Sequence, residues 1–558
     1  MSDIIGDSSE PMAGKAWPFG LLGLLLFAVG VAAWRPIPVG VWHDDGVYML
    51  VAKALAEGQG LVYAGVVDAP PAAKFPPLYP MVLAGLWFLS DSIGVVTMAA
   101  TFLNLAFLAA AGALFGLAVS RSTPLGLRGG VAIAAIAFAS SDVLRPALIP
   151  LSESLFLLLM SGALAVWPRV EEGHRTAIAL AGALLLGSVA TRTAGLALVI
   201  AFGLTLLLRR RVGSAAAVTA PALAFVLGWG WWSGRAAEAI PEGARDLLGP
   251  YGGWIAQQTV AAPASFLANL PSHALGLGER AVAMAFPGVI GTPIWILGVV
   301  VAPIFVLGIL ALLRRFPPLG WFGIVYLGVL LVWPYLDRRL IVPWFPAFLV
   351  ALVLGVVEAV SRVNKENVKK AAMGVGAVWV LAYASVTAGR IAEGWPTEAY
   401  RLRADRLAAG VEALRQTAPA DAVVGAPEYW AALHLHGGWS VAPSVRFDPL
   451  RADPDEPMWG TVDEQLELWR TLRIDHLLLE QNGVLHSDAL DAVEAACPGA
   501  VVVLARMPSQ MVVRIDGDDT CLTPVSATRR RLSAAAVRRT RSRQPLVMMK
   551  SGLPSNVR

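Results

Sequence analysis

Two adjacent carboxylates stand out in a chain that otherwise avoids charge. Asp44 and Asp45 follow Trp42 and His43, a few residues beyond an apolar segment. A carboxylate that is partly removed from water gains proton affinity and can act as a general base on a hydroxyl or an amine. Two acids at a helix start can equally cap that helix and interact with its dipole. The local sequence leaves both interpretations open.

Five more ionisable side chains lie beside apolar segments. They are Lys74, Glu153, Arg192, Arg338 and Arg339. Ionisable groups near a membrane are costly unless they are paired or solvated, so they are candidates for a functional role. A lysine can hold a phosphate as a point charge, and the arginine fork suits phosphate oxygens. The alternatives are a solvated loop lysine, an ion pair between Glu153 and Arg145, and arginines that anchor the chain at the membrane interface.

The composition indicates that a membrane protein carries these residues. Apolar residues make up 56% of the 558 and charged residues only 15%, which lies outside the range of soluble domains. Long uncharged runs recur from Phe19 to Tyr383, as in a polytopic membrane protein. Neither a P-loop nor a dinucleotide fingerprint occurs in a strand–turn–helix setting, which disfavours an ATP-driven pump and a nucleotide-sugar enzyme.

Eleven spans follow from the apolar runs and from the basic clusters that separate them. The predicted spans are residues 19–34, 93–119, 131–144, 151–167, 178–190, 194–208, 218–232, 293–313, 319–333, 340–360 and 371–386. Basic clusters fall on every second short loop, which places the N-terminus in the cytoplasm and the acidic pair outside. Residues 45–57 and 78–89 are expected as two helices on the outer membrane surface. If 78–89 crossed the membrane instead, every later span would be inverted.

The whole chain divides into four parts, the last of which is a C-terminal tail (524–558). An N-terminal cytoplasmic segment (1–17) precedes the transmembrane domain (18–388), which holds a catalytic outer loop (35–92) and a donor or acceptor loop (234–291). That second loop is expected to be irregular, with an amphipathic section at 269–287. Residues 389–523 are expected to form an extracytoplasmic α/β domain, with strands at 422–426, 476–480, 500–507 and 511–515 and helices at 398–416, 461–473 and 487–496.

The basic character of the chain belongs to its C-terminal tail. Residues 524–558 hold eight Arg, one Lys and no acid, so the rest of the chain carries a net charge of −5 against a total of +4. The charge therefore gives no reason to expect nucleic acid binding. The tail is expected to be a disordered, solvated segment, with contact to anionic lipid as the alternative.

The two cysteines and a histidine pair raise structural alternatives. A hairpin that turns near Ser509 would bring Cys497 and Cys521 opposite each other, and both a disulfide and two free thiols fit that placement. His434 and His436 have no third metal ligand nearby in the sequence, which disfavours a metal site there.

The arrangement of the motifs resembles the GT-C glycosyltransferases. The motifs are His43-Asp44-Asp45-x-x-Tyr48 after the first span, Lys74-x-Pro76-Pro77-Leu78-Tyr79, and Ser152-Glu153-Ser154-Leu155-Phe156 at the start of the fourth. More closely, residues 18–390 resemble bacterial enzymes related to protein O-mannosyltransferases and aminoarabinose transferases. The resemblance implies an α-helical polytopic protein of the bacterial inner membrane. It would move a sugar from a polyprenyl-phosphate carrier to a protein, lipid or polysaccharide acceptor on the extracytoplasmic face, usually with inversion.

The same resemblance assigns roles to the candidate residues. Asp44 is implied as the catalytic base. Asp45, also implied as catalytic, would orient the acceptor or, with Glu153, bind a divalent metal in members that use one. The donor phosphate would be held by Lys74, Arg192, Arg338 and Arg339, and the substrate cavity would include His43, Tyr48, Tyr63, Tyr79 and Glu153. Rival readings are a transporter or lipid flippase, although no inverted repeat is seen, and a non-catalytic scaffold for surface-polymer assembly.

Overall fold

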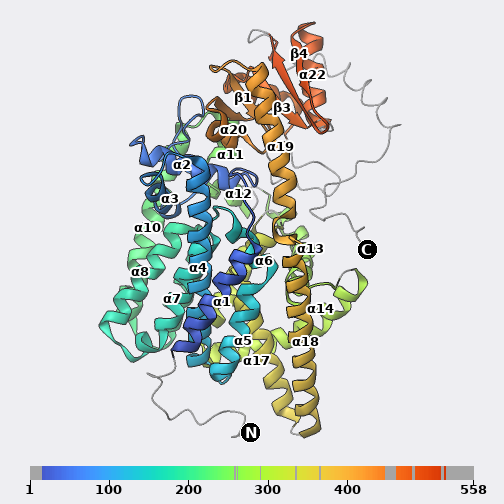
Figure 1. Ribbon diagram of the computed structural model, residues 1–558. Coiled ribbons are helices and arrows are strands. Elements are labelled where there is room, and N and C mark those ends of the chain that lie inside the picture. Colours follow the sequence, from blue (N-terminus) through green and yellow to red (C-terminus); the bar gives the residue numbers. More distant parts are fainter. Residues whose placement is uncertain are drawn as a thin grey trace.

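The protein is a bundle of helices with a small sheet domain at one end (Figure 1). The computed structural model describes residues 16–256, 259–260, 262–289, 291–333, 336–363, 366–446, 460–480, 484–516 and 521–522. The basic tail 524–558 and nearly all of the N-terminal segment 1–17 therefore lie outside the described residues. Helices α18 and α19 follow one another from the bundle into the sheet domain (Figure 1).

The helical part is built from apolar segments whose backbone groups are satisfied within each helix, as a membrane requires. Its elements are α1 (Trp17–Ala33), α2 (Asp44–Ala56), α3 (Leu78–Trp87), α4 (Ile93–Ser122), α5 (Gly126–Ala139), α6 (Ser141–Leu144), η2 (Arg145–Leu148), α7 (Glu153–Glu172), α8 (Arg175–Thr191), η3 (Thr193–Gly195), α9 (Leu196–Leu208), α10 (Val212–Glu238), η4 (Glu242–Ala244), α11 (Arg245–Leu248), α12 (Gly252–Ala256), α13 (Pro263–Ala285), α14 (Thr292–Arg315), α15 (Pro317–Val332), α16 (Arg338–Ile341), α17 (Phe345–Val363) and α18 (Glu366–Ala392).

Several of these helices can cross a bilayer. Among the described residues, six helices are long and apolar enough, and α5 with α6 and η2 passes the same test as one bent span. The other four predicted spans coincide with shorter apolar helices, α1, α8, α9 and α15. A helix rises about 1.5 Å per residue, so these four reach less than the roughly 30 Å of a typical hydrocarbon core. The number of eleven spans therefore stays a prediction.

Residues 35–92, which are predicted to lie on the outer face and which we call the first outer segment, contain the two short helices that the sequence predicts. α2 and α3 pack against each other, and α3 also packs on α4 and α8. The second outer segment, 234–291, is more ordered than predicted, because it contains α11, α12 and the 23-residue α13. Pro271 and two glycines lower the local helix propensity of α13, but packing on α14, α15 and α17 overrides it.

The C-terminal domain is a five-stranded mixed sheet. Its strands are β1 (Val423–Ala426), β2 (Ser440–Pro443), β3 (His476–Glu480), β4 (Val501–Arg506) and β5 (Gln510–Ile515), and its helices are α19 (Trp395–Thr417), α20 (Trp430–Gly437), α21 (Val462–Thr471) and α22 (Val484–Ala496). The strand order is β2-β1-β3-β5-β4, with parallel pairs around β1 and antiparallel pairs around β5. All four predicted strands are confirmed. β2 and α20 were not predicted, because these two short elements form against the first outer segment.

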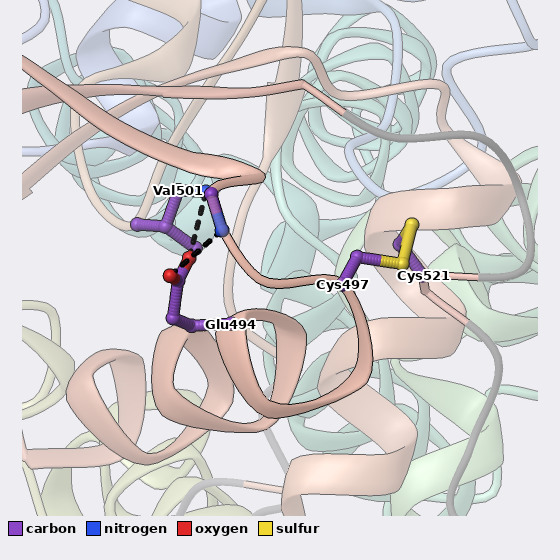
Figure 2. Close-up of a disulfide and its surroundings, with 5 residues drawn as sticks. Glu494, Cys497, Val501 and Cys521 are labelled. Carbon is purple, nitrogen blue, oxygen red and sulfur yellow. Dashed lines mark hydrogen bonds between the residues drawn. A yellow bond between two sulfur atoms is a disulfide. The ribbon is translucent and has the colours of Figure 1, made fainter.

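A disulfide closes the end of this domain. Cys497 is bonded to Cys521, so the bonded alternative is the one that the structure contains (Figure 2). The Glu494 carboxylate accepts hydrogen bonds from the Gly499 and Val501 amides at 2.8 and 3.2 Å, which fixes the turn between α22 and β4 (Figure 2).

The sheet domain and the first outer segment share one apolar core. α20 packs on α2, and the Val441 amide of β2 donates to the Gly65 carbonyl at 2.7 Å. His436 Nε2 lies 3.0 Å from the Val39 carbonyl oxygen and donates to it. Gly40 has a φ of +92°, and a Cβ there would lie 2.2 Å from the Ala432 Cβ. The segment that carries Asp44 is therefore held directly by the C-terminal domain.

Candidate active site

Asp44 lies at the start of α2 and is paired with a distant arginine. Its carboxylate oxygen Oδ2 accepts a short hydrogen bond from Arg339 Nη2, across 295 residues of sequence. Both side chains are largely buried, with exposed fractions of 13% for Asp44 and 15% for Arg339. Arg339 belongs to α16, whose N-cap Asp337 accepts from the Arg339 amide. The short helix therefore aims this guanidinium at the acid.

Glu153 joins two arginines to the same cluster. It begins α7, is 1% exposed, and its Oε1 lies 3.2 Å from Arg339 Nε and 2.8 Å from Arg192 Nη1. Arg192 Nη1 also donates to the Ser152 hydroxyl at 3.0 Å, and the Tyr48 hydroxyl lies 3.0 Å from that same oxygen. Two acids and two arginines thus form one continuous network, which we call the acid–arginine cluster (Asp44, Glu153, Arg192 and Arg339).

The alternative pairing of Glu153 with Arg145 is wrong. The Arg145 guanidinium carbon instead lies 4.8 Å from the centre of the Trp395 ring and 5.7 Å from that of Tyr400. The Tyr400 hydroxyl donates to the Arg145 carbonyl at 3.1 Å. Arg145 therefore holds the start of α19 against the bundle.

Asp45 faces its own backbone rather than the cluster. The carboxylate accepts from the Gly40 amide at 2.7 Å and from the Trp42 amide at 2.9 Å, and the side chain is fully buried. Burial raises the pKa of Asp45 to about 6, although these amide donors oppose the shift. Its contacts hold the turn in which His43 adopts a φ of +65°. The N-cap position of α2 is His43, without a side-chain capping hydrogen bond, so neither acid is the N-cap residue. Asp45 orders the turn that precedes the helix, whereas Asp44 faces the arginine.

Lys74 packs against the second outer segment. Its Nζ donates to the Leu247 carbonyl at 3.0 Å and lies 5.1 and 5.3 Å from the ring centres of Tyr251 and Trp254. Burial lowers the pKa of Lys74 to about 8, and the charge of Asp44 opposes that shift. Lys74 is therefore a buried cation within electrostatic range of Asp44.

The charges around Asp44 outweigh its burial. Burial by itself raises the pKa of this carboxyl, but Arg339, His43 and Lys74 together lower the pKa below its usual value. In the same way, Asp44 and Glu153 outweigh burial at Arg339 and raise the pKa of its guanidinium. Asp44 is thus held ionised, but as the partner of an arginine.

The other predicted site residues have partners outside the acid–arginine cluster. Arg338 turns away, because its Nη1 lies 3.7 Å from Asp142 and its side chain is 47% exposed. His43 Nδ1 lies 3.3 Å from the Glu428 carbonyl of the sheet domain. Tyr63 donates to the Leu248 carbonyl at 2.8 Å, and Tyr79 donates to Asn104 at 3.1 Å. Tyr63 and Tyr79 therefore attach the first outer segment to α11 and to α4.

The residues named for a metal do not fit one. The oxygens of Asp45 accept from amides, and Glu153 Oε1 is paired with two guanidiniums. Glu153 Oε2 is buried and makes no hydrogen bond among the described residues, but a metal ion bound there would lie beside the positive charges of Arg192 and Arg339. His434 and His436 are engaged with main-chain carbonyls. Within the described ranges, no group of three or more potential metal-binding side chains occurs.

Sequence reasoning missed three contributors to the site. Ser152 accepts from Arg192, and Tyr251 and Trp254 enclose Lys74. Ser152 stands next to Glu153 in the motif, so its position was a usable signal. Tyr251 and Trp254 lie in the segment expected to be irregular, and only the packing of that segment brings them to Lys74.

Comparison with known proteins identifies the fold. No protein-family model and no curated sequence matches the chain. Among solved structures, ArnT from Cupriavidus metallidurans bound to undecaprenyl phosphate aligns over 90% of this chain and 98% of its own, at 15% identity and a TM-score of 0.50. The apo form of ArnT aligns over 92% and 99%, at the same identity and score. The oligosaccharyltransferase AglB from Archaeoglobus fulgidus, in complex with an inhibitory peptide and a dolichol-phosphate, aligns over 84% and 70%, at 10% identity and a TM-score of 0.47.

The likeness to ArnT confirms the GT-C fold that the motifs predict. The protein is a polytopic, mostly helical membrane protein of this fold with a small C-terminal sheet domain. At 15% identity the likeness concerns the fold, so the chemistry has to be argued from the acid–arginine cluster and Lys74.

Proposed function

We propose that this protein is a membrane glycosyltransferase that moves a sugar from a polyprenyl-phosphate-linked donor to an acceptor on the extracytoplasmic face. The observation that carries the proposal is the clustering of one carboxylate, Asp44, with two separate cations, Arg339 and Lys74. Displacement at a sugar carbon needs a base for the acceptor and positive charge for the leaving phosphate, and this site contains both.

The proposed reaction is a single displacement. Asp44 takes the proton of the acceptor hydroxyl or amine while the acceptor atom attacks the anomeric carbon of the donor. The bond between that carbon and the phosphate oxygen breaks, and the electron pair leaves with the lipid phosphate. The phosphate gains one negative charge, which Lys74 and Arg339 stabilise. The proton then passes from Asp44 to the released phosphate or to water.

The remaining cluster residues position these groups. Arg192 neutralises Glu153, and Glu153 in turn holds Arg339 between the two acids. Asp45 orders the turn before α2, so it sets the direction of Asp44 without touching the substrate. Arg338, which pairs with Asp142, takes no part in phosphate binding in this proposal.

Substitution of Asp44 tests the proposal. A strain that lacks this protein is complemented with the wild type, Asp44→Asn or Asp142→Asn, at equal amounts in the membrane. Mass spectrometry of envelope glycans should show one modification that is lost in the deletion strain and restored by the wild type and Asp142→Asn only. Restoration by Asp44→Asn would refute the base. With purified protein, lipid-linked donor and acceptor, a flippase would instead leave the sugar on its lipid carrier for every variant.

A further inference from the structure

We propose that Arg339 masks Asp44 in the free protein and that an anionic lipid phosphate draws Arg339 away, so that the base becomes active only when the donor is bound. The inference rests on the proposed function and adds an order to it. The donor must bind before the acceptor can be activated.

The pair with Arg339 makes Asp44 a poor base in the state that the structure shows. A carboxylate paired with a guanidinium has a lowered proton affinity, and here Arg339 directly occupies Oδ2. While the pair is intact, an acceptor hydroxyl must compete with the guanidinium for that oxygen. Activity therefore requires the Arg339–Asp44 contact to break.

The cluster is built so that Arg339 can leave without depriving Glu153 of a cationic partner. Glu153, the second acid that Arg339 touches, keeps Arg192 at 2.8 Å and so stays neutralised. Only Asp44 loses its direct partner, and a carboxylate without a close cation in a buried site is a stronger base. The departure of Arg339 thus converts the least reactive state of Asp44 into the most reactive one.

Arg339 also has a free donor for an incoming anion. Its Nη1 is buried and makes no hydrogen bond within the part of the chain that the structure describes. A buried, unused guanidinium N–H is costly, and a phosphate oxygen would satisfy it. The charge of Lys74 interacts with those of Asp44 and Arg339. Lys74 is therefore the second cation that such a phosphate could contact.

The exchange couples binding to chemistry. A sugar-linked lipid phosphate carries one negative charge, and breaking its bond to the sugar adds a second. The attraction of Arg339 to the phosphate therefore grows during the reaction. This keeps Arg339 from returning to Asp44, where it would block proton transfer. After transfer, Asp44 is protonated and does not compete for Arg339. Loss of the proton and of the lipid phosphate restores the masked state.

The test is a double-mutant cycle on binding, with undecaprenyl phosphate as the probe and protein in lipid nanodiscs. Because Asp44 competes with the phosphate for Arg339, Asp44→Asn should tighten binding about tenfold, within the usual range for coupled sites. In the Arg339→Gln background the same substitution should change affinity less than about twofold, because there is no competition to relieve. Polyprenol without phosphate should show no tightening.

The cycle separates competition from simple charge repulsion. Removing a negative charge near an anion helps binding in both backgrounds, whereas competition helps only when Arg339 is present. Equal gains in the two backgrounds, or no gain in either, would overturn the masking. The matched control is Asp142→Asn, which removes the acidic partner of Arg338 as Asp44→Asn removes that of Arg339. Asp142→Asn should leave the affinity for undecaprenyl phosphate unchanged. An equal gain from Asp142→Asn would also overturn it.

Failure of this inference can be told from failure of the proposed function. If Asp44→Asn abolishes transfer without tightening undecaprenyl phosphate binding, Asp44 is the base and the masking is wrong. If Asp44→Asn supports transfer, the proposed function is wrong whatever the binding cycle shows. Folding of each variant is checked by gel filtration and by its melting temperature in the nanodisc.

Discussion

Neutralising Glu153 should destabilise the fold more than any surface charge change in this protein. Glu153 is 1% exposed and compensates the charges of both Arg192 and Arg339. The Glu153→Gln variant keeps the shape of the side chain but leaves two buried guanidiniums that repel each other. Removing one partner of a buried ion pair typically costs about 3–5 kcal/mol.

Two remaining contacts place the expected cost at the lower end of that range. Arg339 keeps Asp44, and Arg192 keeps the Ser152 hydroxyl at 3.0 Å. We therefore expect a loss of about 3 kcal/mol in the free energy of unfolding. The matched control is Glu358→Gln, because Glu358 also contacts arginines, but the side chains of these arginines (Arg314, Arg315 and Arg362) are 43% to 61% exposed. Exposed pairs contribute about 1 kcal/mol or less.

Unfolding by SDS in mixed micelles, followed by tryptophan fluorescence, measures both variants under one condition. The reasoning requires a clear excess loss for Glu153→Gln over Glu358→Gln. It also requires Glu153→Asp, which keeps the charge, to recover part of the stability. Equal losses for the two Gln variants would refute the view that Glu153 is the counter-ion that holds the cluster together.

Three other predictions concern the edges of the site. The affinity for undecaprenyl phosphate should fall as the pH rises through about 8, because Lys74 loses its proton there; the fall should reach up to about tenfold per pH unit. Lys74→Arg should remove this pH dependence. A flat curve for the wild type would exclude Lys74 as a phosphate ligand. Gly40→Ala should expose the junction between the first outer segment and the sheet domain to limited proteolysis, whereas Gly58→Ala, with a φ of +76° but no atom within 4 Å of the added Cβ, should not. Replacing Cys497 and Cys521 by Ser should lower the stability of the sheet domain by about 3 kcal/mol, seen as faster hydrogen exchange in α22 and β5, and should leave sugar transfer intact.

Local patterns in the sequence were sufficient for most of the elements. The apolar runs located the helices, because a helix that crosses a membrane needs about 20 consecutive apolar residues. The strand at His476–Glu480 was located to the residue by its flanking turn and its apolar run. The segment 234–291 was misjudged, because its helices are stabilised by neighbours that no local pattern reveals.

The sequence by itself predicted that Asp44, Asp45 and Lys74 share one segment on the outer face, from their nearness along the chain and from the charge of the flanking loops. Only the tertiary structure decided what each of them faces. Asp44 and Asp45 are neighbours, yet one meets an arginine 295 residues away and the other meets its own backbone. Arg338 and Arg339 divide in the same way between Asp142 and Asp44. Successive residues of a helix point about 100° apart, so the packing of the whole bundle selects which member of each pair reaches the site.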